Sequence, residues 1–308
     1  MSALRVGTRG SALALAQTKA LAARFAGEVE IVEITTQGDV DRAPLAQIGG
    51  TGVFTSALRE ALLADEVDVI VHSMKDLPTA PHPGIVLAAV AKREDARDAL
   101  CARDGLAFDD LPEGAKVGTG SPRRKAQLQR LRPDLEVVDI RGNVETRLAR
   151  AQGPDADLDA VVLALAGLTR LGRTDAVTDT LPLHRFPTAP AQGALAVETR
   201  DGDAAALHAV AKADHAVTRA CADAERLVLA GLEAGCSAPI AASAQVDDGM
   251  LFLTATVYAL DGSRHLTASH AYTLDGQSAA ELSEAAMDVA GRAVRELVDA
   301  GAMELDRA

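Results

Sequence analysis

The sequence predicts an α/β protein with two similar units of alternating strands and helices, followed by a small α+β domain. Three observations lead to this fold class. Apolar strand-like runs alternate with helix-like runs early in the 308 residues, and this alternation restarts after the charged segment 91–95. Towards the C-terminus, two Asp-Gly pairs separate extended runs, a pattern that is typical of β-hairpins.

The first unit begins with an expected strand over 4–8, and an Arg-Gly-Ser turn leads from it into a helix. Further strands are expected over 29–35, 67–72 and 85–90, with a helix over 54–64. The run 67–72 is apolar almost throughout, as in a strand that is buried on both faces. Strands that alternate with helices favour a parallel sheet with right-handed crossovers.

The second unit repeats this pattern after the charged segment. Its expected elements are strands over 116–119, 136–140 and 160–165 and helices over 122–132 and 143–152. The loop 188–193 then leads into one more strand, 194–198, and a helix over 204–212.

The C-terminal region has a different order of elements. A helix over 216–234 is followed by three extended runs, 240–246, 251–260 and 265–274, with the Asp-Gly pairs between them. The last expected element is an amphipathic helix that carries Leu282, Val289 and Leu297 on one face. Strands in meander order with flanking helices predict a separate small α+β domain.

Composition excludes several classes of protein. The net charge of -13, with two Tyr, five Phe and no Trp, argues against a nucleic-acid partner, which needs a basic surface and stacking side chains. The three cysteines are odd in number and widely spaced, so we expect no disulfide framework, no metal site and a reducing, cytoplasmic environment. No run of 18 uncharged apolar residues occurs, so we expect no membrane span.

One stretch of this acidic chain is basic. Residues 116–150 contain nine Lys or Arg and four Asp or Glu. Arg123 and Arg124 follow Gly-Thr-Gly-Ser-Pro, so they open a helix whose first backbone amides also favour anions. Guanidinium groups bind carboxylates and phosphates in a bidentate manner, which favours an anion site over the alternative of a solvated helix face.

Two further residues are candidates for chemistry. Asp76 follows the buried strand directly, after Lys75, so its carboxylate is a candidate general acid or base; the alternative is an Asp in a turn. Cys236 follows a helix-ending glycine, where a thiol is a candidate nucleophile or attachment point. We assign Cys101 and Cys221 to the core and His72 to packing or hydrogen bonding at a strand end. These residues indicate a polycarboxylate ligand and leave the reaction open.

Five motifs lie in one order along the chain: His72 to Pro78 (HSMKDLP), Gly118 to Arg124 (GTGSPRR), Arg141 to Arg147 (RGNVETR), Ala166 to Gly172 (AGLTRLG) and Glu233 to Pro239 (EAGCSAP). Together they resemble the porphobilinogen deaminase, or hydroxymethylbilane synthase, family. The resemblance extends from Arg5 to the C-terminal helix.

The resemblance implies both a fold and an activity. The fold has two βαβ domains of the type II periplasmic-binding-protein kind around a cleft, with a three-stranded antiparallel sheet in the third domain. The implied ranges are 1–92 with 193–212, 97–190, and 216–308 for the domain that carries the cysteine. The activity is that of a transferase of porphyrin and haem biosynthesis. It joins four porphobilinogen molecules head to tail, releases ammonia and frees 1-hydroxymethylbilane by hydrolysis.

The resemblance also assigns residues. Cys236 would hold a covalent dipyrromethane cofactor through a thioether, and Asp76 would be the catalytic carboxylate. The cofactor would be bound by Ser73, Lys75, Thr119, Ser121, Arg123 and Arg124, and substrate by Arg9, Ser11, Arg141, Arg147, Arg170 and Gln192. No metal is implied. We expect a cytoplasmic monomer whose partner is porphobilinogen, with no nucleic acid and no membrane.

The sequence departs from the family pattern at Gln47, Thr51, Gly120 and Ala191, where relatives often carry lysine, lysine, serine and glycine. Two alternatives remain open. A noncatalytic solute-binding or sensor module would explain the arginines but not a reactive cysteine. A cysteine hydrolase that uses Cys236 would need a histidine to activate the thiol, and the sequence places none beside it.

Overall fold

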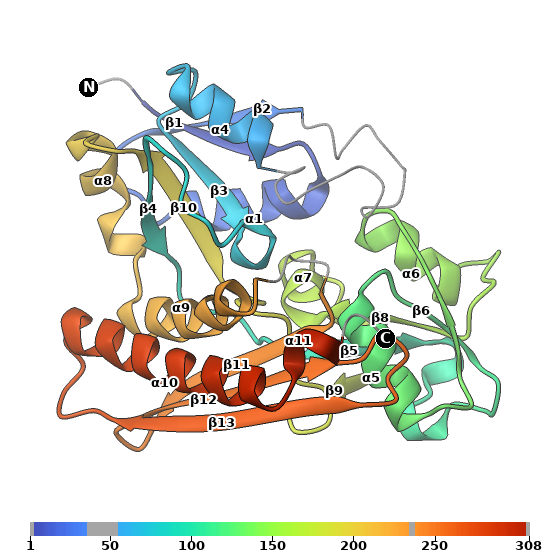
Figure 1. Ribbon diagram of the computed structural model, residues 1–308. Helices are drawn as coiled ribbons and strands as arrows, with labels where there is room; N and C mark the ends of the chain where they lie inside the picture. Colours follow the sequence, from blue (N-terminus) through green and yellow to red (C-terminus); the bar gives the residue numbers. More distant parts are fainter. Residues whose placement is uncertain (1–2, 36–54, 234–237, 306–308) are drawn as a thin grey trace. The chain divides into compact units, whose positions relative to one another are not determined.

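A computed structural model describes residues 3–35, 55–233 and 238–305 of the chain. The chain divides into two compact units, Met1–Glu94 with Gly193–Arg219, and Asp95–Gln192 with Ala220–Ala308. Figure 1 labels most of the helices and strands of both units. The second unit contains two sheets, and the division of the chain into three domains stays a prediction.

The first unit is built on a five-stranded sheet with the order β2-β1-β3-β10-β4. Its strands are β1 (Leu4–Arg9), β2 (Val29–Ile34), β3 (Val69–Ser73), β4 (Ile85–Val90) and β10 (Leu195–Arg200). Strand β1 is parallel to β2 and β3, but β10 is antiparallel to both β3 and β4. The expectation of a parallel sheet is therefore wrong for β10. This strand returns from a distant part of the chain and starts where β3 ends, since Leu195 pairs with Ser73.

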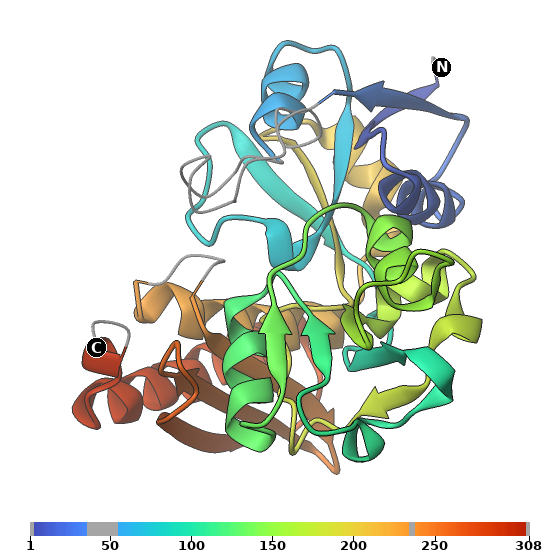
Figure 2. The ribbon, with the colours of Figure 1, turned by 90° about the vertical axis from the view of Figure 1, so that its right-hand side faces the viewer.

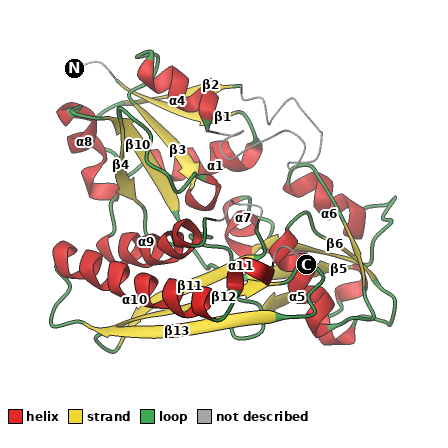
Figure 3. Cartoon of the chain, viewed as in Figure 1, coloured by secondary structure: helices red, strands yellow, loops and turns green. Residues whose placement is uncertain are grey.

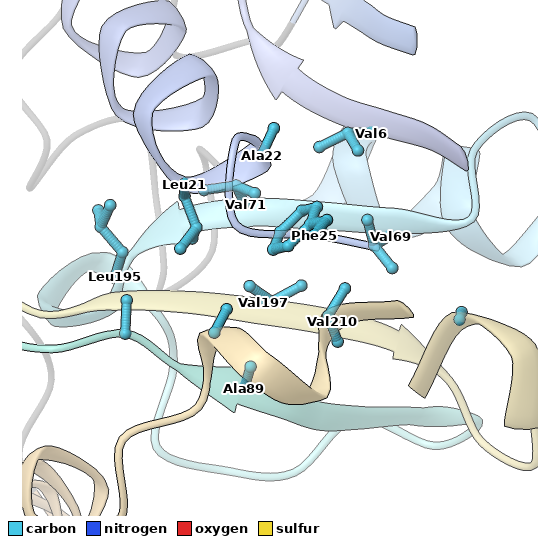
Figure 4. Close-up of a cluster of buried hydrophobic side chains, with 13 residues drawn as sticks. Val6, Leu21, Ala22, Phe25, Val69, Val71, Ala89, Leu195, Val197 and Val210 are labelled. Carbon is cyan, nitrogen blue, oxygen red and sulfur yellow. The ribbon is translucent and has the colours of Figure 1, made fainter. Parts of the chain in front are cut away.

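Helices cover both faces of this sheet. Helices α1 (Ala12–Ala22) and α8 (Ala204–Val210) contribute to one buried cluster, and α4 (Ser56–Leu63) contributes to another. Figure 4 shows the first cluster, in which Leu21 and Phe25 pack against strand residues such as Val71. On β3, alternate side chains point to opposite faces, so Val71 belongs to the first cluster and Ile70 to the second. The predicted burial of this strand on both faces is confirmed.

The second unit contains another five-stranded sheet, with the order β7-β6-β8-β5-β9. Its strands are β5 (Asp98–Ala102), β6 (Lys116–Gly118), β7 (Glu136–Val138), β8 (Ala160–Ala164) and β9 (Asp179–Leu181). Strand β6 is parallel to β7 and β8, whereas β5 is antiparallel to β8 and β9. Strand β5 thus takes the place that β10 has in the first sheet, so the two sheets share one strand order.

Helix α5 (Pro122–Leu131) packs on one face of this sheet, and α6 (Val144–Gln152) and α7 (Leu165–Arg170) pack on the other. The green and yellow-green elements of this sheet can be followed in Figure 2. Strand β9 was not among the expected strands. It has three residues and begins with an aspartate, so its side-chain pattern gives little periodic signal.

The remaining sheet is an antiparallel meander of β11 (Ile240–Asp247), β12 (Met250–Tyr258) and β13 (His265–Thr273). Asp248 and Gly249 both have positive φ, 44° and 68°, as a two-residue hairpin turn requires. The long helix α10 (Ala279–Asp299) lies along this sheet, with α9 (Ala216–Gly231) earlier in the chain and α11 (Ala302–Leu305) after it (Figure 3). Two α/β sheets and a small antiparallel sheet with helices confirm the predicted fold class.

Candidate active site

The segment that carries Asp76 is fixed by its buried neighbours. It forms a single 3-10 turn, η1 (Met74–Asp76), directly after β3. Met74 is fully buried and its amide donates to the carbonyl of Ala194 at 3.0 Å, and the buried Leu77 donates back to the Met74 carbonyl at 3.2 Å. The side chain of Asp76 is exposed between these two anchors. A carboxylate on a rigid turn at a strand end is well placed to meet a ligand.

Four other predicted residues share this edge of the first sheet. Arg9 ends β1, Ser11 is the N-cap of α1, and Ser73 and Lys75 flank the end of β3. Strands β1 and β3 are parallel neighbours, so their carboxyl ends lie together. The Ser11 hydroxyl accepts from the Ala14 amide at 3.3 Å, and Ser73 exchanges hydrogen bonds of 3.2 and 3.3 Å with Gln17. The structure therefore brings together the predicted residues of the first unit.

The paired arginines open α5 as predicted. Ser121 is the N-cap and accepts from the Arg124 amide at 3.4 Å, and Pro122 occupies the first helical position. Thr119 is buried, and its hydroxyl accepts from the Ser121 amide at 3.2 Å. Further along this basic stretch, Arg150 is paired with Asp157.

Both arginine side chains are buried, with 3% and 7% of Arg123 and Arg124 exposed, and they share the carboxylate of Asp98. Arg123 Nη2 lies 2.8 Å from Asp98 Oδ2, and Arg124 Nη2 lies 2.6 Å from Oδ1. Burial of Asp98 opposes its ionisation, but the two guanidinium groups outweigh this and hold its pKa far below its usual value. Desolvation lowers the pKa of Arg123.

The charges of Arg123, Arg124 and Asp98 sum to one positive charge. Arg123 Nη1 also donates to Gln127 Oε1 and to the Pro187 carbonyl, each at 2.8 Å, and Arg124 Nη1 donates to the Val162 carbonyl at 3.0 Å. The Nε atoms of both arginines are buried and make no hydrogen bond within the residues that the structure describes. An anionic group would fit this donor set. The assignment of these arginines to cofactor carboxylates stays a prediction.

The loop before β10 is tied to the same carboxylate. Gln192 is almost fully buried, and its Nε2 donates to Asp98 Oδ1 at 2.8 Å and to the Ala96 carbonyl at 2.7 Å. Ala191 has a φ of 60°, in the left-handed region, and its amide donates to Glu225 Oε2 at 2.6 Å. The substrate-binding role of Gln192 stays a prediction.

Three predicted arginines follow the carboxyl ends of parallel strands in the second unit. Arg141 and Arg147 come after β7, and Arg170 ends α7, which follows β8. All three are half-buried, and Arg147 Nε donates to the Gly142 carbonyl at 2.8 Å. Strand β6 lies between β7 and β8, so these arginines share an edge of the sheet with the start of α5. Their roles toward substrate stay predictions.

The cysteines divide into two groups. Cys101 and Cys221 are both buried, which confirms their assignment to the core. Burial raises the pKa of Cys101 to about 12, so its thiol is protonated at neutral pH. Cys236 lies outside the described residues, as do Gln47 and Thr51.

Sequence reasoning missed three buried acids, Asp98, Glu198 and Glu225. Each has a local signal, because an acidic residue in an otherwise apolar strand or on the buried side of a helix requires polar partners. Asp98 opens the strand Asp-Ala-Leu-Cys-Ala, and Glu198 lies between Val197 and Thr199. Glu225 accepts from the amides of Ala191 and Ala244.

Comparison with known proteins assigns the chain to a family. Residues 4–208 match the model described as porphobilinogen deaminase, dipyromethane cofactor binding domain, and residues 219–288 match the model of the porphobilinogen deaminase C-terminal domain. The chain belongs to the porphobilinogen deaminase family. Among its relatives, the porphobilinogen deaminase of Leifsonia xyli subsp. xyli is 61% identical, over 98% of this chain and 94% of that protein. The porphobilinogen deaminase of Thermobifida fusca is 56% identical, over 88% and 86%.

Solved structures give weaker likenesses. A nutrient-binding protein from Burkholderia cenocepacia bound to methionine is 13% identical, over 68% of this chain and 90% of its own, with a TM-score of 0.41. The methionine-binding protein MetQ is also 13% identical, over 68% and 89%, with a TM-score of 0.42.

Within residues 3–35, 55–233 and 238–305, no three His, Cys, Asp or Glu side chains group as metal ligands. Among the helices of these residues, none has both the length and the apolar character needed to cross a membrane.

Proposed function

We propose that this enzyme joins four porphobilinogen molecules head to tail and hydrolyses the product to 1-hydroxymethylbilane, as a step of tetrapyrrole biosynthesis. The observation that carries the proposal is the match to both family models over residues 4–208 and 219–288. In each condensation, a carbon–carbon bond forms between the aminomethyl carbon of one porphobilinogen and the free pyrrole carbon of the growing chain. One ammonia leaves, and the attacked pyrrole carbon loses one proton.

Asp76 is the proposed catalytic residue. As an acid it would assist the departure of ammonia, and as a carboxylate it would stabilise the cation that is left on the substrate and then accept the proton of the pyrrole carbon. Its exposed position on a turn with buried anchors on both sides supports this role, because the carboxylate is accessible while its backbone is held.

The cofactor is proposed to be dipyrromethane, held by a thioether to Cys236. When bound, it supplies the pyrrole carbon to which the first substrate is joined. The buried thiols are poor alternatives, since burial raises the pKa of Cys101 to about 12. The residues proposed to bind this cofactor, chiefly through its carboxylates, are Ser73, Lys75, Thr119, Ser121, Arg123 and Arg124. The cluster of two arginines on one aspartate supports this choice, because its remaining positive charge suits a carboxylate.

The acetate and propionate of each incoming porphobilinogen are proposed to be bound by Arg9, Ser11, Arg141, Arg147, Arg170 and Gln192. A growing chain of pyrroles accumulates two carboxylates with each addition, which requires several cationic partners. The net charge of -13 makes these local cations functionally significant, because the rest of the protein repels such a chain. We further propose that the protein acts as a cytoplasmic monomer without a nucleic-acid partner, and light scattering on the purified protein would test the monomer.

Intact mass spectrometry combined with an activity assay tests this function. The purified protein should exceed its sequence mass by one dipyrromethane, and it should convert porphobilinogen to a linear tetrapyrrole. Cys236→Ser should lose both the added mass and the activity, whereas the control Cys101→Ala should keep both. An unmodified wild type with full activity would overturn the cofactor proposal, and reversible binding of porphobilinogen without turnover would favour a solute-binding module.

A second experiment tests the role of Asp76. Asp76→Asn should fold and carry the cofactor, but its turnover should fall by about 10²- to 10⁴-fold, the usual contribution of a general acid or base. Turnover close to that of the wild type would remove Asp76 from the proposed mechanism.

A further inference from the structure

A buried cluster of three ionisable side chains includes a residue near the end of β3, the strand that leads into the segment carrying Asp76. Glu198 on β10, Arg59 on α4 and His72 on β3 are 5%, 8% and 6% exposed. Arg59 Nε and Nη2 donate to the two oxygens of Glu198 at 3.0 and 2.6 Å. His72 Nε2 lies 3.2 Å from Glu198 Oε2. These three residues connect two strands of the first sheet and the helix α4.

Glu198 is the ionised centre of this cluster. Burial of Glu198 opposes its ionisation, but the contacts with His72 and Arg59 outweigh it and lower the pKa of Glu198 to about 2. Arg59 supplies one full positive charge for this carboxylate, so the Arg59–Glu198 pair is balanced. His72 Nε2 is buried and makes no hydrogen bond within the described residues, so its approach to Glu198 Oε2 is a close polar contact.

His72 is joined to Asp76 by a short and rigid path. His72 pairs with Ala196 and Ser73 with Leu195 in the antiparallel ladder of β3 and β10, and η1 starts at the next residue. Because alternate side chains of a strand point to opposite faces, His72 is held by Glu198 on one face and Ser73 by Gln17 on the other. The end of β3 is thus fixed on both faces by His72 and Ser73, four and three residues before Asp76.

We propose that His72, held by Glu198 and Arg59, is a positioning residue that fixes η1 so that Asp76 meets the substrate in its reactive geometry. This inference rests on the catalytic role proposed for Asp76. It differs from a purely structural role for the cluster in a measurable way. A structural ion pair changes stability alone, whereas loss of a positioning contact slows the chemical step in protein that remains folded.

A pair of substitutions at His72 leaves the Arg59–Glu198 ion pair intact and tests the proposal. His72→Leu removes the polar group that contacts Glu198, while His72→Gln keeps an N–H at a similar reach. His72→Leu should lower kcat by about 10- to 100-fold, because a displacement on the order of 1 Å at a catalytic group has effects of this size. KM and the mass of the bound cofactor should not change. His72→Gln should restore kcat to within about threefold of the wild type, if geometry rather than charge is responsible.

Thr199→Val provides a matched control. Thr199 is the next residue of β10, is fully buried, and donates its hydroxyl to the Asp68 carbonyl at 2.9 Å, so the substitution removes a hydrogen bond of similar burial that does not involve β3's carboxyl end. This variant should lose stability and keep its kcat. An equal fall in kcat for Thr199→Val and His72→Leu would overturn the proposal, as would an unchanged kcat in His72→Leu.

A double-mutant cycle with Asp76→Asn separates this inference from the proposed function. If His72 acts through Asp76, His72→Leu should change the residual rate of Asp76→Asn less than about twofold, since the group to be positioned is gone. An undiminished effect in that background would overturn the positioning role. Normal turnover of Asp76→Asn alone would instead overturn the catalytic role of Asp76. Should His72→Leu fail to fold, His72→Asn, whose amide is too short to reach Glu198, replaces it in the same cycle with the same expected loss.

Discussion

Two buried carboxylates, Glu198 in the first unit and Asp98 in the second, differ in the number of arginines that bind them. Glu198 has one arginine, Arg59, on both of its oxygens. Asp98 has two, with Arg124 on one oxygen and Arg123 on the other. The Arg59–Glu198 pair is neutral, whereas Asp98 with its two arginines retains one positive charge inside the protein.

Each carboxylate also contacts a further buried polar side chain. His72 lies against Glu198 and precedes the turn that carries Asp76, and Gln192 donates to Asp98 from the loop before β10. The difference in net charge determines what each cluster is suited to do. A balanced cluster needs no further ion and acts as a rigid support, whereas an unbalanced one is suited to an anionic ligand.

The largest effect on stability is expected when Asp98 loses its negative charge beside Arg123 and Arg124. Asp98→Asn leaves two buried guanidinium groups without a counter-charge, so the free energy of unfolding should fall by about 3–5 kcal/mol and cofactor loading should stop. Urea unfolding and intact mass would measure the two effects.

Asp95→Asn is the matched control for this substitution. Asp95 pairs with Arg97 at 2.6 Å, but both side chains are exposed. A solvent-exposed pair of this kind contributes about 1 kcal/mol or less. If Asp98→Asn is no more destabilising than Asp95→Asn, the two buried arginines do not depend on Asp98.

Acid should weaken the Arg59–Glu198 ion pair in a defined range of pH. The pKa of Glu198 is lowered from 4.5 to about 2, so its stabilising effect is complete above about pH 5 and is lost as the pH falls towards 2. A shift of this size corresponds to about 3 kcal/mol. The double variant Arg59→Met/Glu198→Met, which replaces the ion pair with apolar side chains, should lack this part of the acid sensitivity. Identical pH dependence of unfolding in the two proteins would contradict the prediction.

Removal of one arginine from each cluster should have unequal effects on stability. Arg59→Met leaves Glu198 without a cation, while Arg123→Met leaves Asp98 with Arg124 and a balanced pair. We therefore expect Arg59→Met to be more destabilising than Arg123→Met by about 2 kcal/mol in urea unfolding. Cofactor loading should be reduced more by Arg123→Met than by Arg59→Met. Equal losses of stability would show that the charge balance does not distinguish the clusters.

The sequence predicted the parts of this comparison that depend on local pattern. The opening of α5 by Ser121 and Pro122 followed from capping chemistry, and it placed Arg123 and Arg124 correctly at a helix start. Burial of both guanidinium groups against Asp98 was not predictable in this way. It depends on β5 lying two strands from β6 in the sheet, and no local pattern encodes that neighbourhood.

The cluster of Arg59, His72 and Glu198 was missed for the same reason. Glu198 was assigned to the end of a strand, and His72 was expected to pack or to form a hydrogen bond at a strand end. Only the antiparallel insertion of β10 between β3 and β4 brings these two side chains together, from positions 126 residues apart in the sequence. Strand–helix alternation predicts parallel neighbours and gives no signal for such an insertion.

The smallest effect is expected at the uncharged partner of Asp98. Gln192→Met removes the hydrogen bonds to Asp98 and to the Ala96 carbonyl but leaves both arginines on the carboxylate. Because no charge becomes unpaired, the loss of stability should be about 1 kcal/mol, well below that of Asp98→Asn. If Gln192 also binds substrate, KM for porphobilinogen should rise while the bound cofactor stays at full mass. A loss as large as that of Asp98→Asn would mean that the loop before β10, rather than the charge of the arginines, holds this cluster together.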